Sequence, residues 1–312
     1  MYIATNNYND LKRYTPTFGS RNRMIRTADN VCRNVNREFQ IFSNTRLDKF
    51  SSCDFEISFL RYKEALGDII NAFRWFYTEE EYPQKIFKML DGMKSFKAGN
   101  CEELANATCI ALKMNGFKDA RVCYLYSYNP KTKKVCDLDH SVTVLNLGLP
   151  KDYKFASTDL LPSYKELFKP NNRTLVVDTW AGFADSSKGA VLRYNTDVPL
   201  SVKLKKDDNI MFFPLKDIPM TDKDLEFLKY KYPKLLLKDS KCNLTEEDIE
   251  KFQKIASVGN HKEIIYDIKR SRMLKSACPE YSMRQYALEQ CKNDFGFKVF
   301  SLLMKIVMFF RR

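Results

Sequence analysis

Apolar side chains recur at helical spacing through the first hundred residues of the chain. In the stretch 20–42 they fall near one face of a helix: Met24, Val31, Val35 and Phe39. The stretch 57–96 carries a similar face, and Pro83 suits the first turn of a second helix within it. These periodicities predict helices in both stretches.

A third helix is predicted in the sequence KAGNCEELANATCIALKMNGF. Asn100 can cap it, because an Asn side chain accepts hydrogen bonds from the first free N–H groups of a helix. Glu102 and Glu103 suit the first turn, and Gly116 suits the residue after the last turn. The helix is therefore expected to begin at Cys101.

Three stretches carry strand patterns instead: residues 120–127, 139–147 and 174–180. The first is rich in β-forming residues, the second alternates with a period of two, and the third is a short apolar run. Shorter strand-like stretches follow at 201–205 and 210–215. From about residue 219 onward the pattern becomes helical, with candidates at 222–231, 245–258, 260–276 and 282–310.

These elements predict an α+β fold with three regions. Residues 1–56 form a basic, partly helical extension, residues 57–218 form the core, and residues 219–312 form a helical C-terminal region. The length of 312 residues suits one large domain or two ordinary ones.

The net charge of +13 favours an acidic partner, such as an anionic membrane surface, nucleic acid or an acidic protein. The lysines are spread along the chain, which indicates a generally solvated basic surface. No zinc-finger, basic-zipper or RNA-recognition pattern occurs, so nucleic acid is not the expected partner.

The nine cysteines are irregularly spaced and form no CxxC pair. A disulfide framework and a structural zinc site are therefore not expected, and a reducing, cytoplasmic compartment is. Cys136 and His140 stand four residues apart, but no second Cys/His pair accompanies them, so no metal is predicted. The N-terminal sequence lacks the apolar segment of a secretory signal.

Candidate chemistry centres on Cys101, because a thiolate at the first turn of a helix is stabilised by free N–H groups and by the helix dipole. The chain has two histidines, and His140 is the one predicted to lie on a strand. Asp178 could orient its ring as the third group of a catalytic triad. Asp139 competes for that role but, as the chain neighbour of His140, should point to the opposite face.

Three segments around these residues resemble the transglutaminase-like and papain-like superfamily of cysteine acyltransferases: GNCEELA, DLDHSVTV and LVVDTW. The resemblance covers about residues 85–185 and keeps the order Cys, His, Asp. It implies a helix bearing Cys101 packed on an antiparallel sheet, and a triad of Cys101, His140 and Asp178. Thr179 stands where many relatives have proline.

The resemblance implies acyl transfer or hydrolysis at a protein glutamine or peptide amide through a thioester, as in transglutaminases, deamidases and proteases. No cofactor is implied. Several bacterial effectors that modify host proteins are built this way, which suggests secretion into a host cytoplasm and a protein substrate. The alternative is a catalytically silent binding module on the same scaffold.

Two parts of the expected site stay open. No Gln occupies positions 86–100, so the second oxyanion donor is unassigned, with Asn100 and the N–H of Cys101 as candidates. Trp180 could shield the triad from water or serve as a plain core residue. The apolar stretch 295–312 carries Lys298 and Lys305 and could pack on the core, lie on an anionic membrane surface, or span a bilayer.

Overall fold

The described part of the chain is an α+β structure. The computed structural model describes residues 18–41, 80–96, 99–150, 166–196, 207–215, 217–239 and 242–256, with a few single residues between them. Its helices are α1 (Phe18–Phe39), α3 (Gln84–Phe96), α4 (Cys101–Met114), α5 (Ser187–Thr196), α6 (Asp222–Lys231) and α7 (Glu246–Ala256). Its strands are β1 (Arg121–Tyr128), β2 (Val135–Leu145), β3 (Leu175–Asp178), β4 (Phe183–Ser186) and β5 (Asn209–Pro214). The predicted fold class is confirmed at this level.

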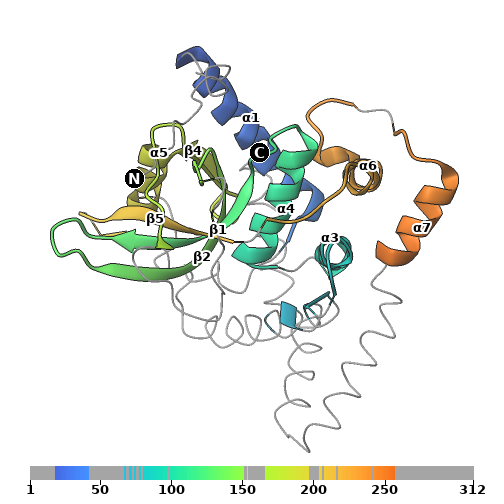
Figure 1. The fold of residues 1–312 in the computed structure, drawn as a ribbon, viewed down its shortest axis with the longest axis horizontal. Coiled ribbons are helices and arrows are strands. Elements are labelled where there is room, and N and C mark those ends of the chain that lie inside the picture. Colours follow the sequence, from blue (N-terminus) through green and yellow to red (C-terminus); the bar gives the residue numbers. More distant parts are fainter. Residues whose placement is uncertain are drawn as a thin grey trace, which may run out of the picture.

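The strands form one antiparallel sheet in the order β4-β3-β2-β1-β5. β2 is its central strand: Thr143 is paired with Val122 on one side and with Val177 on the other. The β1–β2 hairpin projects from the body of the molecule, with β5 alongside (Figure 1). A central strand is covered on both sides, which explains why β2 is buried from His140 to its end.

A bulge interrupts the β1–β2 ladder next to His140. Tyr124 is paired with Ser141, whereas Tyr126 is paired with Asp137, so one residue of β1 faces three residues of β2. Within this bulge Asp139 has a φ of 46°, in the left-handed region that Asp tolerates better than most residues. The period-two pattern of the sequence therefore does not hold where His140 is placed.

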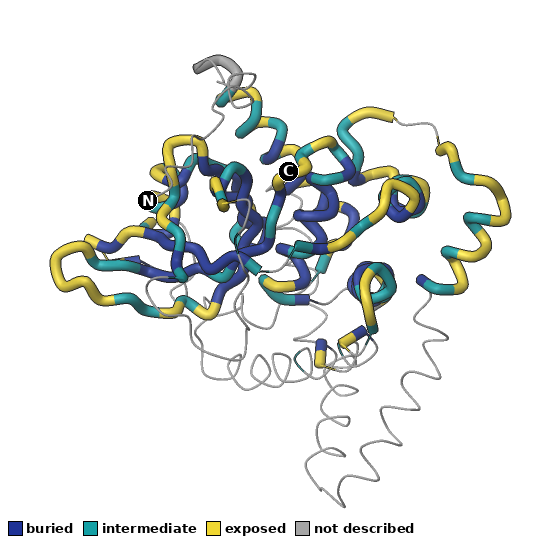
Figure 2. Tube along the Cα trace, in the orientation of Figure 1, coloured by how far each residue is buried: buried dark blue, intermediate teal, exposed yellow. Residues whose placement is uncertain are grey.

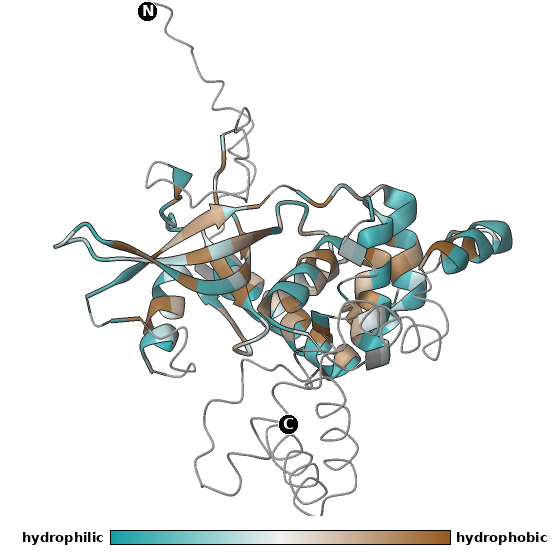
Figure 3. Cartoon of the chain, turned by 90° about the horizontal axis from the view of Figure 1, so that it is seen from below, coloured by the Kyte–Doolittle hydropathy of each residue, from teal (hydrophilic) through white to brown (hydrophobic). Residues whose placement is uncertain are grey.

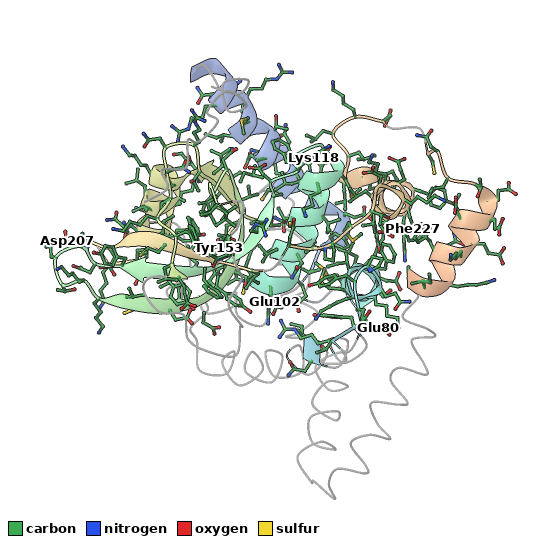
Figure 4. The ribbon with its side chains drawn as sticks, in the orientation of Figure 1. Glu80, Glu102, Lys118, Tyr153, Asp207 and Phe227 are labelled. Atoms are coloured by element: carbon green, nitrogen blue, oxygen red, sulfur yellow. The ribbon has the colours of Figure 1, made fainter. Side chains whose placement is uncertain are left out.

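Helix α4 lies between the sheet and helices α3 and α6 (Figure 1). Small residues such as Ala105, Ala107 and Ala111 let neighbours approach it closely, and most of the helix is buried (Figure 2). In Figure 4, Glu102 labels the start of the helix and Lys118 the turn just after its end. Cys101 is its first residue, as the sequence predicts.

One hydrophobic core joins the three predicted regions. It contains Val31 and Val35 of α1, residues of α4 and the sheet, and Phe227 of α6. Figure 3 shows hydrophobic residues concentrated along the strands and the inner helices, and hydrophilic residues at the tip of the β1–β2 hairpin. The described parts of the terminal regions are thus packed against the central region, and the predicted domain boundaries stay predictions.

Some predicted elements differ from the structure or lie outside it. Leu204 and Lys205 belong to no strand, so the strand expected at 201–205 is wrong at these residues. β4 and α5 were not predicted. Among the described helices, none has the length and apolar character needed to cross a membrane. The stretches 260–276, 282–310 and 295–312 lie outside the described residues.

Substitution of Phe227 can test whether α6 belongs to this hydrophobic core. Its ring stacks on Phe252 of α7 at 4.9 Å and meets Phe87 of α3 edge-on at 5.3 Å. We expect Phe227→Ala to lower the free energy of unfolding by about 3–5 kcal/mol in one cooperative transition. Urea unfolding followed by circular dichroism measures this. Tyr230→Ala, on the exposed side of α6, is the control and should change stability by less than about 0.5 kcal/mol.

Two transitions in the Phe227→Ala protein, with the sheet unfolding as in the wild type, would contradict the single core.

Candidate active site

His140 and Asp178 form a buried charge pair at the edge of the core. The Nε2 atom of His140 lies 2.7 Å from Oδ2 of Asp178, and the two side chains are each 1% exposed. β2 supplies His140 from its bulge, and Asp178 is the last residue of the neighbouring strand β3. Since Asp178 occupies Nε2, the other ring nitrogen, Nδ1, is left for a third group.

Cys101 lies beside this ring, because its charge and hydrogen bonding contribute to the raised pKa of His140. Cys101 is a free, partly exposed thiol, in contrast to the buried Cys109 and Cys123. The structure therefore brings together the three residues that the sequence selected: His140 contacts Asp178, and Cys101 lies near the same ring.

The Asp178 carboxylate accepts three hydrogen bonds. Besides His140, the hydroxyl of Tyr194 donates to Oδ2 at 2.7 Å and the N–H of Ala181 donates to Oδ1 at 2.8 Å. Ala181 is presented by a tight turn after β3, in which the N–H of Gly182 donates to the Asp178 carbonyl at 2.7 Å. Gly182 has a φ of 84°, which a side chain would disfavour.

These contacts determine the charge state of the pair. Burial lowers the pKa of His140, but the charge and hydrogen bond of Asp178, together with Cys101, raise it to about 10. Burial raises the pKa of Asp178, whereas His140, the Ala181 N–H and the Tyr194 hydroxyl lower it. Near neutral pH the pair is therefore an imidazolium and a carboxylate.

Aromatic rings enclose the imidazole. Trp180 meets His140 edge-on, with ring centroids 4.9 Å apart, and is 2% exposed. The ring of Tyr194 also meets the imidazole edge-on, with ring centroids 6.4 Å apart. Both readings of Trp180 thus have a basis, because it belongs to the core and also borders the imidazole.

Buried threonines connect the elements that carry the three groups. The Thr143 hydroxyl of β2 donates to the Ala105 carbonyl of α4 at 2.7 Å. The Thr108 hydroxyl of α4 lies 2.5 Å from the Thr179 hydroxyl, next to Asp178. Each of these bonds is buried, where an unpaired hydroxyl is costly, so they fix the spacing of α4, β2 and β3.

A second carboxylate holds the start of α4. Glu103 is buried and accepts two bonds from Arg74, at 2.5 and 2.9 Å, and one from Tyr77 at 2.7 Å. It also accepts the backbone N–H of Asn100 at 2.8 Å. Burial alone would raise the pKa of Glu103, but Arg74, Asn100 and Tyr77 lower it. Glu103, two residues after Cys101, is thereby a carboxylate held in place by four hydrogen bonds.

This geometry bears on the oxyanion candidates. The N–H of Asn100 is already directed to Glu103, so it is not available for a substrate. The first N–H groups of α4 have no acceptor within the helix, because helical hydrogen bonds begin four residues on. The N–H of Cys101 therefore stays a candidate, and so does the side chain of Asn100.

Sequence reasoning missed several residues of this site. Tyr194 lies on α5, which has no clear helical pattern, and Arg74 is 29 residues away from Glu103. Asp139 is exposed, and Asp178 rather than Asp139 is the partner of His140. Among the described residues, no group of three or more His, Cys, Asp or Glu side chains could hold a metal ion.

Comparisons with known proteins add no relative. No family model, no curated protein and no solved structure matches the chain.

The charge of His140 can be measured directly. We expect its ring to stay protonated at pH 8 and to titrate near the raised pKa of about 10. Asp178→Asn removes the main cause of this rise, so burial should then lower the pKa well below that of the wild-type ring. Nitrogen-15 NMR of the imidazoles measures both, and His140→Gln assigns the signal because the chain has two histidines. A neutral His140 ring at pH 7 in the wild type would contradict the charge pair.

Proposed function

We propose that the chain is a cysteine-dependent enzyme that performs acyl transfer or hydrolysis at a protein glutamine or peptide amide. The single observation that carries this proposal is that Cys101, the first residue of a buried helix, lies near His140, which is paired with Asp178. An imidazolium beside a thiol stabilises the thiolate, which is the reactive form. The helix start adds free N–H groups and the positive end of the dipole.

The proposed reaction begins with attack of the Cys101 thiolate on the amide carbonyl carbon. The carbonyl oxygen becomes an oxyanion, which the N–H groups at the start of α4 can stabilise. His140 gives its proton to the leaving nitrogen, the C–N bond breaks, and a thioester and a free amine result. Asp178 holds the ring in place and stabilises its charged form.

In the second half of the proposed reaction the thioester is resolved, and His140 acts as a base instead of an acid. Neutral His140 takes a proton from an incoming water or amine, which attacks the thioester carbonyl. The C–S bond breaks and the thiolate returns to its place beside the imidazolium. Water yields deamidation or proteolysis, and an amine yields transamidation.

The proposal has a rival in a silent binding module on the same scaffold. The closeness of Cys101 to His140 supports the enzyme, since a module without chemistry has no need of a thiol beside a buried imidazolium. The two ion-pair networks behind Cys101 and His140 also support it, because buried charges are costly and cluster at functional sites. Membrane attachment through 295–312 and secretion into a host cell stay sequence-based proposals.

Reactivity of Cys101 tests the proposal without knowledge of the substrate. We expect iodoacetamide to alkylate Cys101 faster than Cys242 by at least about tenfold at pH 7, because Cys101 lies beside the His140 imidazolium. Peptide mass spectrometry after timed quenching gives both rates in one sample. Cys242 is the matched internal control, since it is an exposed thiol. Equal rates at the two thiols would remove the basis of the proposal.

Loss of chemistry should follow loss of the thiol. We expect wild-type protein incubated with a host-cell lysate to produce protein deamidation, crosslinks or new termini, and Cys101→Ala to abolish them while keeping the fold. Cys242→Ala is the control and should keep full activity. Mass spectrometry separates the outcomes, because deamidation adds about one dalton whereas transamidation joins chains. Products that persist in Cys101→Ala would rule out Cys101 as the nucleophile.

A further inference from the structure

The hydroxyl of Tyr194 contacts the same oxygen that holds His140. It donates to Oδ2 of Asp178 at 2.7 Å, and Nε2 of His140 lies 2.7 Å from that atom. Tyr194 is fully buried, and a buried hydroxyl needs an acceptor. Here the acceptor is the carboxylate of the proposed triad. Together with the Ala181 N–H on Oδ1, three donors from three parts of the chain hold both oxygens.

We propose that Tyr194 is a positioning residue of the active site, which fixes the Asp178 carboxylate so that Oδ2 faces His140. This inference rests on the proposed function, because it assigns a role within the same triad. Tyr194 acts through Asp178 on the ring and, through the ring, on the Cys101 thiol.

The surroundings of Tyr194 make it a rigid donor. Its ring meets Phe183 of β4 edge-on, with centroids 5.4 Å apart, and the N–H of Leu204 donates to its carbonyl at 3.2 Å. Helix α5 follows β4 directly and contacts both β3 and β4. The tyrosine thus approaches Asp178 from an element separate from those that carry Cys101 and His140.

Removal of the hydroxyl has a defined chemical effect. The groups that face Asp178 are His140 from β2, Tyr194 from α5 and the turn N–H of Ala181, while the Cys32 thiol of α1 approaches its main-chain carbonyl. The Tyr194 hydrogen bond lowers the pKa of the Asp178 carboxyl. Without it the carboxyl is protonated at a higher pH, and His140 loses its counter-charge earlier as the pH falls.

The test compares Tyr194→Phe with Tyr232→Phe in the full chain. Tyr232 is also buried, but its hydroxyl has no hydrogen-bond partner among the described residues, so its loss is a matched control. The rate of alkylation of Cys101 by iodoacetamide is measured from about pH 4 to pH 9, with Cys242 as the internal reference. Near-ultraviolet circular dichroism identifies the conditions in which each variant is folded.

We expect Tyr194→Phe to slow alkylation of Cys101 by about tenfold at pH 7, because a hydrogen bond to a charged group is lost. The acid limb of its pH profile should move to higher pH, whereas Tyr232→Phe should match the wild type. An effect on packing alone would leave the acid limb in place.

Two outcomes are distinguishable as failures. If wild-type Cys101 reacts no faster than Cys242, the proposed function fails and the role of Tyr194 fails with it. If wild-type Cys101 is fast but Tyr194→Phe keeps the wild-type rate and profile, or Tyr232→Phe loses as much, the role of Tyr194 is overturned and the proposed function stands.

Discussion

The site depends on one interaction, the buried pair of His140 and Asp178. Two charges removed from water are costly unless each is compensated by the other and by further hydrogen bonds. Here the compensation is complete on the carboxylate side, where Tyr194 and the Ala181 N–H supplement the imidazolium. The surrounding chain is therefore arranged around the carboxylate, and the ring takes its orientation from it.

The backbone around His140 and Asp178 provides the geometry that these hydrogen bonds need. The bulge in β2 places His140 within reach of the end of β3, and Gly182 allows the turn that directs the Ala181 N–H back to Asp178. Asn36 of α1 donates to the Thr179 carbonyl at 3.1 Å and holds the same turn. Irregular backbone is thus concentrated where the charges lie, and regular strands support it.

The Glu103 carboxylate holds the segment that carries Cys101, as the Asp178 carboxylate holds His140. Glu103 lies in the first turn of α4, and its bonds to Arg74, Tyr77 and Asn100 tie the helix start to the preceding chain. The hydrogen bonds of the buried threonine hydroxyls then connect α4 to β2 and to the turn after β3. Rigid support of this kind keeps a thiol and an imidazole at a fixed separation, which acyl transfer requires.

Elements whose signals are local could be predicted from the amino-acid sequence. The helix 222–231 is found at its predicted bounds, and α4 begins at Cys101, because caps, breakers and periodic apolar positions act over a few residues. Three features depend on contacts between distant segments and appear only in the folded chain. They are the bulge at His140, the helix that brings Tyr194 to Asp178, and the pairing of Arg74 with Glu103. Buried polar groups take whichever partners the packed chain brings within about 3 Å, and no pattern of neighbouring residues encodes that proximity.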